Sequence, residues 1–504
     1  MIYQTSIMEL HNFLISFIAL ILWFFIKPYL HRRSSNLPPG PTALPIIGSL
    51  HLLGSRPNQS LAKLAKLHGP LFTLSLGSVT TIVASSPETA KEILQKQEKI
   101  FSARTVPDVI TAQPNPQATL AWVPGDHRWR NRRRICSTRM FTNQRLDSLQ
   151  ELRHRKVEHM VSHIKKHCSG TGAGEAVYIG RLAFGTTLNL ISNTMFSVDM
   201  VDPEFETAQE FNDLVWRIME DAGKPNLSDF FPALRRLDLQ GTKRHIRPAY
   251  ERLHEIFEET IEKRVKERSK GMERKGDFLD VLLDQCEEDG SGFDRQTIKP
   301  LILDLFIAGS DTSAMTTEWG MAELLHKPEI LRKVREEILE AIGKASPVRE
   351  SDFEMLPYLQ AVVKETMRLH PAPPLLLPYR AENDTVMFGY TVPKNSQVLV
   401  NAWAIGRDPQ YWDNPSEFRP ERFLGSDLDY KGRDFKYIPF GAGRRICPGM
   451  PLAIRMVNLM LASIIQSFTW RLPEGITPEK LDMEEQFGVT LRKAVPLLAI
   501  PSME

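Results

Sequence analysis

The sequence predicts a mainly α-helical protein with small β-sheets, preceded by one N-terminal membrane-anchor helix. Helix-like patterns cover most of residues 145–275, residues 301–325 and residues 452–468, whereas alternating strand-like patterns are short. Of the 504 residues, 42% are hydrophobic and 25% are charged, which is typical of a globular protein. A single large core is compatible with this length.

The expected anchor is an apolar run over residues 13–26, followed by Lys27, Arg32 and Arg33. Basic residues after the run, and not before it, favour a retained anchor over a cleaved signal peptide, and a buried helix is the weaker alternative. The positive-inside tendency then places the rest of the chain in the cytosol. We therefore expect an anchor with its basic flank (residues 1–33), a proline-rich hinge (residues 34–45) and one large domain (residues 46–504).

Charge and cysteine content exclude two broad classes of protein. The net charge of +2 gives no reason to expect a nucleic-acid partner. The four cysteines are Cys136, Cys168, Cys286 and Cys447, and their wide spacing argues against a disulfide framework. A reducing compartment suits such a chain.

Local patterns predict the elements that precede the first long helices. Residues 71–83 alternate around Gly77 and predict a hairpin. Pro87 begins a helical stretch that runs to residue 97. Prolines interrupt residues 101–125, so this segment is expected to be an irregular loop that either borders a pocket or covers the core. The charged segment 258–274 is expected to be a solvated helix and loop.

One cysteine near the C-terminus lies in a segment suited to an anionic sulfur. Residues 439–449 read Pro-Phe-Gly-Ala-Gly-Arg-Arg-Ile-Cys-Pro-Gly, and a helix-like apolar run follows. Gly441, Gly443 and Gly449 allow the backbone to fold closely around the sulfur. No second cysteine or nearby histidine completes a zinc site, so Cys447 is a candidate single axial ligand of iron. An isolated cysteine of this kind is more often structural.

The complete spacing of residues 440–449 favours a ligand role for Cys447 over a structural one. The pattern Phe-x-x-Gly-x-Arg-x-Cys-x-Gly resembles the haem-binding signature of the cytochrome P450 superfamily, with Phe440, Gly443, Arg445, Cys447 and Gly449 at its fixed positions. This resemblance implies the fold of that superfamily, and haem b whose iron is held by the Cys447 thiolate. It also implies that residues 46–504 form a haem-thiolate monooxygenase domain.

A basic helix is expected at residues 128–134. Trp129 and Arg133 stand four residues apart on one of its faces and resemble the superfamily's clamp for the haem propionates. The alternative is a solvated basic helix, and the outward arginines suit an acidic electron-transfer partner. Many relatives have a further propionate-binding arginine where this chain has Tyr379 and then Arg380, which leaves open whether either residue replaces that contact.

The long helical run over residues 301–325 contains an acid beside a hydroxyl, Asp311 and Thr312. Such a pair can carry protons, and the segment matches the superfamily's oxygen-activation motif, which implies that both residues are catalytic. A helix cap or a hydroxyl bonded to its own helix is the structural alternative.

A second pattern is structural in character. Glu365 and Arg368 lie three residues apart on one helix face, and the segment 418–423 supplies Arg422. The resemblance implies that these three form a buried network in which each charge needs its partners.

Several segments are expected to approach a substrate. Residues 213–232 resemble plant enzymes of the geraniol hydroxylase group, and the stretches 401–409 and 482–490 also resemble plant relatives. Apolar residues in such places are as often part of the core. The expected pocket residues are Asn226, Leu227, Phe306, Ala308, Leu375, Leu376, Phe487 and Val489.

The resemblance implies a plant microsomal monooxygenase that uses O2 and takes electrons from NADPH through a cytochrome P450 reductase, with cytochrome b5 as a second possible donor. It implies a single-pass anchor in the endoplasmic reticulum membrane, among membrane lipid, with the catalytic domain cytosolic. The nearest resemblance indicates a terpenoid substrate, either a monoterpene alcohol such as geraniol or a sesquiterpene or diterpene. A phenolic or alkaloid substrate is the alternative, and a haem-thiolate isomerase or dehydratase and a non-catalytic haem-binding protein stay open.

Overall fold

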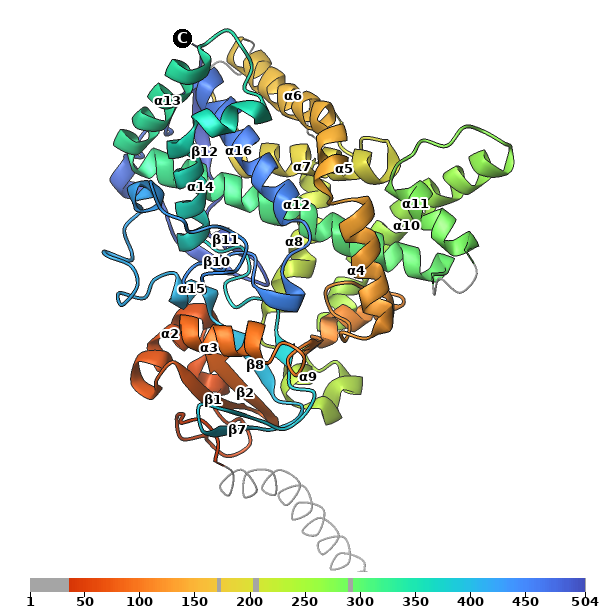
Figure 1. The fold of residues 1–504 in the computed structure, drawn as a ribbon, viewed down its shortest axis with the longest axis vertical. Helices are drawn as coiled ribbons and strands as arrows, with labels where there is room; N and C mark the ends of the chain where they lie inside the picture. The colour runs from red at the N-terminus through yellow and green to blue at the C-terminus, as the bar shows by residue number, and fades with distance from the viewer. Residues whose placement is uncertain (1–35, 170–173, 203–207, 289–292, 504) are drawn as a thin grey trace, which may run out of the picture.

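The computed structural model describes residues 36–169, 174–202, 208–288 and 293–503 (Figure 1). The expected membrane anchor, residues 1–33, lies outside the described residues. The expected mainly helical fold with small sheets is confirmed. A sheet occupies the lower end of the view in Figure 1, and the long helices lie above it.

Helix α12 (Arg295–His326) runs through the middle of the helical part and contacts α7, α14 and α16. It begins with a reciprocal cap, because the Asp294 side chain accepts from the Thr297 backbone N–H at 2.8 Å while Thr297 Oγ1 accepts from the Asp294 N–H. Most of its residues are buried on every side, which explains why the segment reads as apolar throughout.

The other helices are α2 (Pro57–His68), α3 (Pro87–Lys91), α4 (His127–Arg139), α5 (Asn143–Ser148), α6 (Gln150–Ser169), α7 (Ile179–Phe196), α8 (Ala208–Gly223), α9 (Leu227–Phe230), α10 (Thr242–Ser269), α11 (Phe278–Glu287), α13 (Pro328–Ile342), α14 (Pro357–Leu369), α15 (Ala402–Ile405) and α16 (Met450–Ser467). Short 3-10 or π turns, labelled η, connect several of them. Helix α16 is long and apolar enough to cross a membrane, but 67% of it is buried inside the fold, as befits a core helix.

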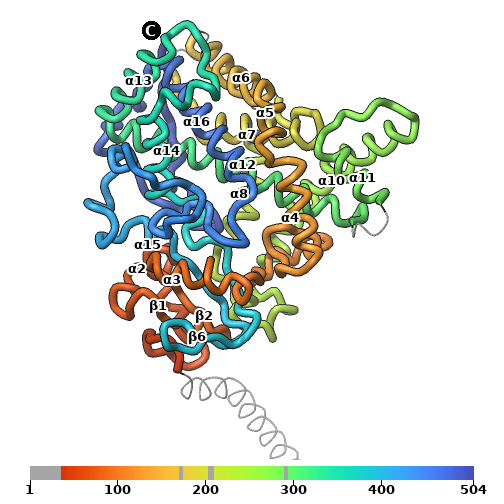
Figure 2. The backbone as a smooth tube through the Cα atoms, in the orientation of Figure 1, coloured from red at the N-terminus to blue at the C-terminus, as the bar shows by residue number. Residues whose placement is uncertain are grey.

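The expected hairpin is confirmed as β1 (Leu71–Leu76) and β2 (Val79–Ala84), in which Leu76 pairs with Val79. These strands belong to a sheet of order β1-β2-β8-β5-β3, and β2 lies parallel to β8 although more than 300 residues separate them. Figure 2 shows the red and orange N-terminal strands beside cyan segments from the C-terminal half of the chain. The remaining strands are β3 (Ala103–Arg104), β4 (Val177–Tyr178), β5 (Tyr379–Arg380), β6 (Thr385–Met387), β7 (Tyr390–Val392), β8 (Gln397–Val400), β9 (Thr469–Arg471), β10 (Glu485–Phe487), β11 (Leu491–Lys493) and β12 (Leu498–Ser502).

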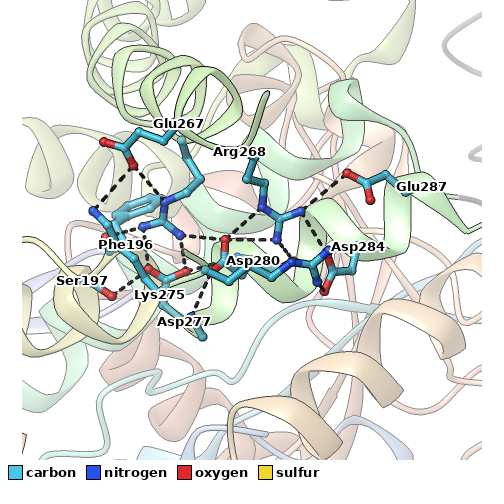
Figure 3. Close-up of polar contacts among 12 residues, drawn as sticks. Phe196, Ser197, Glu267, Arg268, Lys275, Asp277, Asp280, Asp284 and Glu287 are labelled. Carbon is cyan, nitrogen blue, oxygen red and sulfur yellow. Dashed lines mark hydrogen bonds and ion pairs between the residues drawn. The ribbon is translucent and has the colours of Figure 1, made fainter. Parts of the chain in front are cut away.

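The end of α10 is less solvated than its charge predicts. Arg264 is only 4% exposed and bonds Asp277 and Asp280, at 2.7 and 2.9 Å. Arg268 contacts Asp280 and Asp284 (Figure 3). The expectation of a solvated helix over 258–274 is therefore wrong for these arginines, because α11 and its N-cap residue Asp277 supply the carboxylates that make their burial tolerable.

Candidate active site

Cys447 follows the 3-10 turn η8 (Gly443–Arg445) and precedes α16. Its backbone N–H donates to the Phe440 carbonyl at 3.0 Å, which closes the loop. Burial raises the pKa of the Cys447 thiol, whereas the N–H groups of Gly449 and Met450 and the charge of Arg133 act in the opposite direction. The loop therefore aims donors and a cation at the sulfur, as a thiolate ligand requires.

The glycine at position 443 is required by geometry. Its φ is +64°, and a Cβ added there would lie 1.7 Å from the Leu94 carbonyl oxygen. Leu94 belongs to the π-helical turn η2 (Glu92–Lys96), so the cysteine loop is held directly against this turn. Any side chain at Gly443 would push the loop away.

Three arginines line the same cavity as Cys447. Arg445 Nη2 donates to the Val123 carbonyl at 2.5 Å, Arg133 Nη2 donates to the Ile446 carbonyl at 2.6 Å, and Arg104 Nη1 donates to the Leu377 carbonyl at 2.7 Å. None of the three forms an ion pair with any described residue.

The electrostatics of these arginines indicate an anionic ligand. Burial, together with the nearby Arg104, lowers the pKa of Arg445 to about 9, and burial also lowers the pKa of Arg133. The buried Nε of Arg104 has no hydrogen-bond partner. Cations desolvated in this way fit a group that brings its own carboxylates, such as the two propionates of haem.

Trp129 completes this end of the cavity. Its indole N–H donates to the Leu120 carbonyl at 3.2 Å, and the Arg445 guanidinium lies 4.1 Å from the centre of its ring. Trp129 and Arg133 of α4 thus both reach the cavity, on the face that their spacing predicts.

Beside residues 379 and 380 the structure places a further arginine, Arg104, in the cavity wall. Tyr379 lines the cavity and Arg380 does not. Arg104 pairs with Tyr379 across β3 and β5, and its guanidinium lies 4.1 Å from the centre of the Tyr379 ring. Sequence reasoning missed Arg104, because its segment reads as an irregular loop and only this long-range pairing brings it to the site.

The outward face of α4 is basic. Arg128, Arg130 and Arg134 are exposed, as expected. Arg132 differs: it is 5% exposed and donates to the carbonyls of Gln117 and Thr119.

Helix α12 contributes Thr312 and Ala308 to the cavity wall. The Thr312 hydroxyl donates to the Ala308 carbonyl at 2.7 Å, so it is bonded to its own helix in this structure. Its position on the wall nevertheless leaves it able to turn toward a bound ligand.

Asp311 faces away from this cavity. It is fully buried, accepts from the Thr490 hydroxyl at 2.8 Å and from Arg492 at 2.9 Å, and borders a second, more polar cavity of about 490 Å³. Thr490 lines the cavity that contains Cys447, so the Asp311–Thr490 hydrogen bond joins the two cavities.

The cavity beside Cys447 has a volume of about 310 Å³. Three of the expected pocket residues, Ala308, Leu376 and Val489, line it. Leu376 has a left-handed backbone, with φ of +51°, in the turn before β5. Val489 lies in the turn between β10 and β11. Sequence reasoning missed other lining residues on distant elements, among them Ile110, Gln113, Ile218, Tyr250 and Leu303.

The other five expected pocket residues do not line this cavity. Phe306 is fully buried and packs edge-to-face on Phe257, with ring centroids 4.9 Å apart, on the core side of α12. Leu375 packs into the apolar cluster beside the sheet, and Phe487 lies on strand β10.

The last two expected residues, Asn226 and Leu227, lie at the start of α9. Asn226 caps α9, since its side chain accepts from the Ser228 N–H at 3.1 Å. Leu227 is 38% exposed, facing away from the core.

The expected charge network is present. Arg368 bonds Glu365 at 2.6 Å, and Arg422 bonds the same carboxylate at 2.9 Å. The side chains of Glu365 and Arg368 are fully buried. Arg368 also donates to the carbonyls of Pro415 and Glu417, which ties α14 to the segment before the cysteine loop.

Fold and site together define a helical protein with a half-buried cysteine beside an apolar cavity and a set of arginines without ion-pair partners among the described residues, which fits an anionic cofactor. The chain belongs to the cytochrome P450 family, whose sequence model matches residues 38–497, and it is a cytochrome P450 monooxygenase. The family implies a haem-thiolate cofactor.

The comparisons confirm the resemblance to plant enzymes of the geraniol hydroxylase group. The geraniol 8-hydroxylase of Catharanthus roseus is 50% identical over 94% of this chain and 95% of its own length. The 7-ethoxycoumarin O-deethylase of Helianthus tuberosus is 48% identical over 93% of this chain and 94% of its own. A zebrafish cytochrome P450 solved with progesterone has a TM-score of 0.75 at 26% identity, over 89% of this chain and 99% of that one.

Proposed function

We propose that this monooxygenase hydroxylates a small terpenoid, with a monoterpene alcohol such as geraniol as the first candidate. The observation that carries the proposal is the cavity itself, which is largely apolar and reaches from Cys447 past Thr312. Apolar walls with few polar groups suit a small hydrophobic molecule. The 50% identity to a geraniol 8-hydroxylase supports the terpenoid class.

The described residues fit distinct tasks in this reaction. Cys447 would ligate the haem iron, and Arg104, Arg133, Arg445 and Trp129 would hold the propionates. When bound, haem supplies the activation of dioxygen and the insertion of one oxygen atom into a C–H bond, while the other leaves as water.

A separate group of residues would supply protons. Thr312 would present its hydroxyl to the cavity, and Asp311 would pass protons from the polar cavity on the far side of α12. Thr490 lies where such a proton would cross, because it bonds Asp311 and lines the reaction cavity.

The cellular setting follows from the same proposal. Electrons would come from NADPH through a diflavin reductase, with cytochrome b5 as a second donor, and the exposed arginines of α4 would attract an acidic surface of either partner. The enzyme would be anchored in the endoplasmic reticulum membrane with its catalytic domain in the cytosol.

A phenolic substrate is the second candidate, and the 48% identity to a 7-ethoxycoumarin O-deethylase favours it. Microsomes that contain this protein and a plant reductase should be incubated with terpenoids and phenolics, with and without NADPH, and analysed by mass spectrometry. We expect an NADPH-dependent gain of one oxygen atom on a monoterpene alcohol. The same gain on phenolics alone would move the substrate class, and turnover without NADPH would indicate isomerase or dehydratase chemistry.

Replacing Thr312 by alanine tests the proton supply. We expect haem binding to be retained, because Thr312 contacts no group that holds the cofactor, while product formed per NADPH falls by roughly tenfold to a hundredfold, as for loss of one proton-transfer group. Peroxide release should rise in step. The measurement is the ratio of product and peroxide to NADPH consumed.

Thr316→Ala is the matched control for this variant. Thr316 also lines the cavity, and its hydroxyl donates to the Thr312 carbonyl at 2.8 Å. Thr316→Ala should leave the ratio of product and peroxide to NADPH consumed unchanged. Equal coupling in Thr312→Ala and the parent enzyme would refute the assignment.

A further inference from the structure

Two polar side chains in the cavity wall have neither a partner nor a task in the site described above. Gln113, which follows the 3-10 turn η3 (Asp108–Ala112), is 4% exposed, and its Oε1 accepts no hydrogen bond. Tyr250 of α10 is 2% exposed, and no described residue hydrogen-bonds to its hydroxyl. Both side chains line the cavity. Buried polar atoms are normally paired, so an unpaired acceptor and an unpaired hydroxyl in one cavity point to a polar group on a ligand.

These two groups lie toward one end of the cavity. Element η3 packs against α10, which carries Tyr250. Helix α10 also packs against α12, and Tyr250 and Asp304 line the same cavity from these two helices. Asp304 precedes Thr312 by eight residues on α12, roughly 12 Å along the helix axis.

Asp304 is already occupied by the protein. Its Oδ2 accepts from the backbone N–H groups of Leu120 and Ala121, at 2.6 and 2.9 Å. It thus fixes the loop that covers the cavity, whereas Gln113 Oε1 and the Tyr250 hydroxyl make no hydrogen bond to any described residue.

We propose that Gln113 and Tyr250 bind the hydroxyl group of a substrate alcohol and thereby place the opposite end of the molecule beside Thr312. Gln113 Oε1 accepts the hydroxyl proton, and the Tyr250 hydroxyl donates to the hydroxyl oxygen. This inference rests on the proposed function and narrows it: the substrate is an alcohol whose hydroxyl is remote from the carbon that is oxidised.

The physical reason for such a pair is orientation. An apolar wall discriminates weakly between skeletons that differ by a methylene group, and it does not choose which end of a slender molecule enters first. A buried acceptor and donor at one end penalise the reversed pose, because that pose leaves both unpaired.

The test measures equilibrium binding to the ferric, haem-loaded enzyme. The substrate-induced change in the haem absorption spectrum reports the bound fraction. Three ligands of one skeleton are compared: geraniol, its methyl ether, and the hydrocarbon without the oxygen. The ether keeps the acceptor oxygen and loses the donor. We expect Gln113→Met to weaken geraniol about tenfold and to leave the other two unchanged. We expect Tyr250→Phe to weaken geraniol and the ether by a similar factor and to leave the hydrocarbon unchanged.

Ile110→Val is the matched control, since Ile110 lines the same cavity with an apolar side chain. Ile110→Val should change the affinities for geraniol, its methyl ether and the hydrocarbon by one common factor. The reduced carbon-monoxide spectrum of each variant reports whether the haem site is intact. Equal effects of Gln113→Met on all three ligands, or no effect on any, would overturn the inference.

Failure of the terpenoid assignment can be distinguished from failure of the inference about Gln113 and Tyr250. If terpenoids do not bind and phenolics do, the same comparison is made with 7-hydroxycoumarin and 7-methoxycoumarin, and loss of affinity for the hydroxyl form alone in Gln113→Met would still support the binding pair. If terpenoids are oxidised but alcohol and ether respond alike to Gln113→Met, the proposed function stands and the inference is refuted.

Discussion

Replacing Cys447 by serine should abolish the thiolate-type spectrum of the reduced, carbon-monoxide-bound protein and reduce product formation to background. A serine hydroxyl is too weak an acid to replace a thiolate ligand, and the donors that Gly449 and Met450 direct at the sulfur would face a neutral oxygen. The measurement is the difference spectrum of microsomes that contain the variant, together with their haem content.

Cys286→Ser provides the matched control. Cys286 is half-buried on α11 and does not line the cavity, so its replacement should leave both spectrum and activity unchanged. Retention of the thiolate spectrum in Cys447→Ser would remove this residue as the ligand.

Replacing Glu365 by glutamine should destabilise the fold more than any surface substitution. The change removes the one carboxylate that Arg368 and Arg422 share, and it leaves an uncompensated charge on the fully buried Arg368. Breaking a buried pair from one side costs about 3–5 kcal/mol. We expect a lower thermal midpoint and a lower yield of haem-containing protein, measured by thermal unfolding and by the carbon-monoxide spectrum.

Glu336→Gln is the comparison variant. Its partner Arg332 lies four residues earlier on α13, and both side chains are more than half exposed, so the loss should stay below about 0.5 kcal/mol. Equal midpoints for Glu365→Gln and the parent enzyme would contradict a structural role for the network.

The sequence alone identified those parts of the site whose residues are close together along the chain. The cysteine loop, residues 439–449, carries the proposed ligand Cys447, the glycines and Arg445 within one segment. Trp129 and Arg133, and likewise Glu365 and Arg368, share a helix face because their spacing of four or three residues matches the helical repeat. Local periodicity also sufficed for the β1–β2 hairpin and for α12.

Tertiary structure alone decided which distant residues meet. Arg104 reaches the site only because β3 pairs with β5, and Asp311 turns from the reaction cavity because Arg492 and Thr490 of a C-terminal hairpin bond it. Phe306 shares α12 with Ala308, yet it points into the core. Gln113 and Tyr250 line one cavity because a loop packs against α10. Sequence pattern determines which face of an element is apolar, whereas the packing of elements far apart in the chain determines whether that face meets the core, the cavity or solvent.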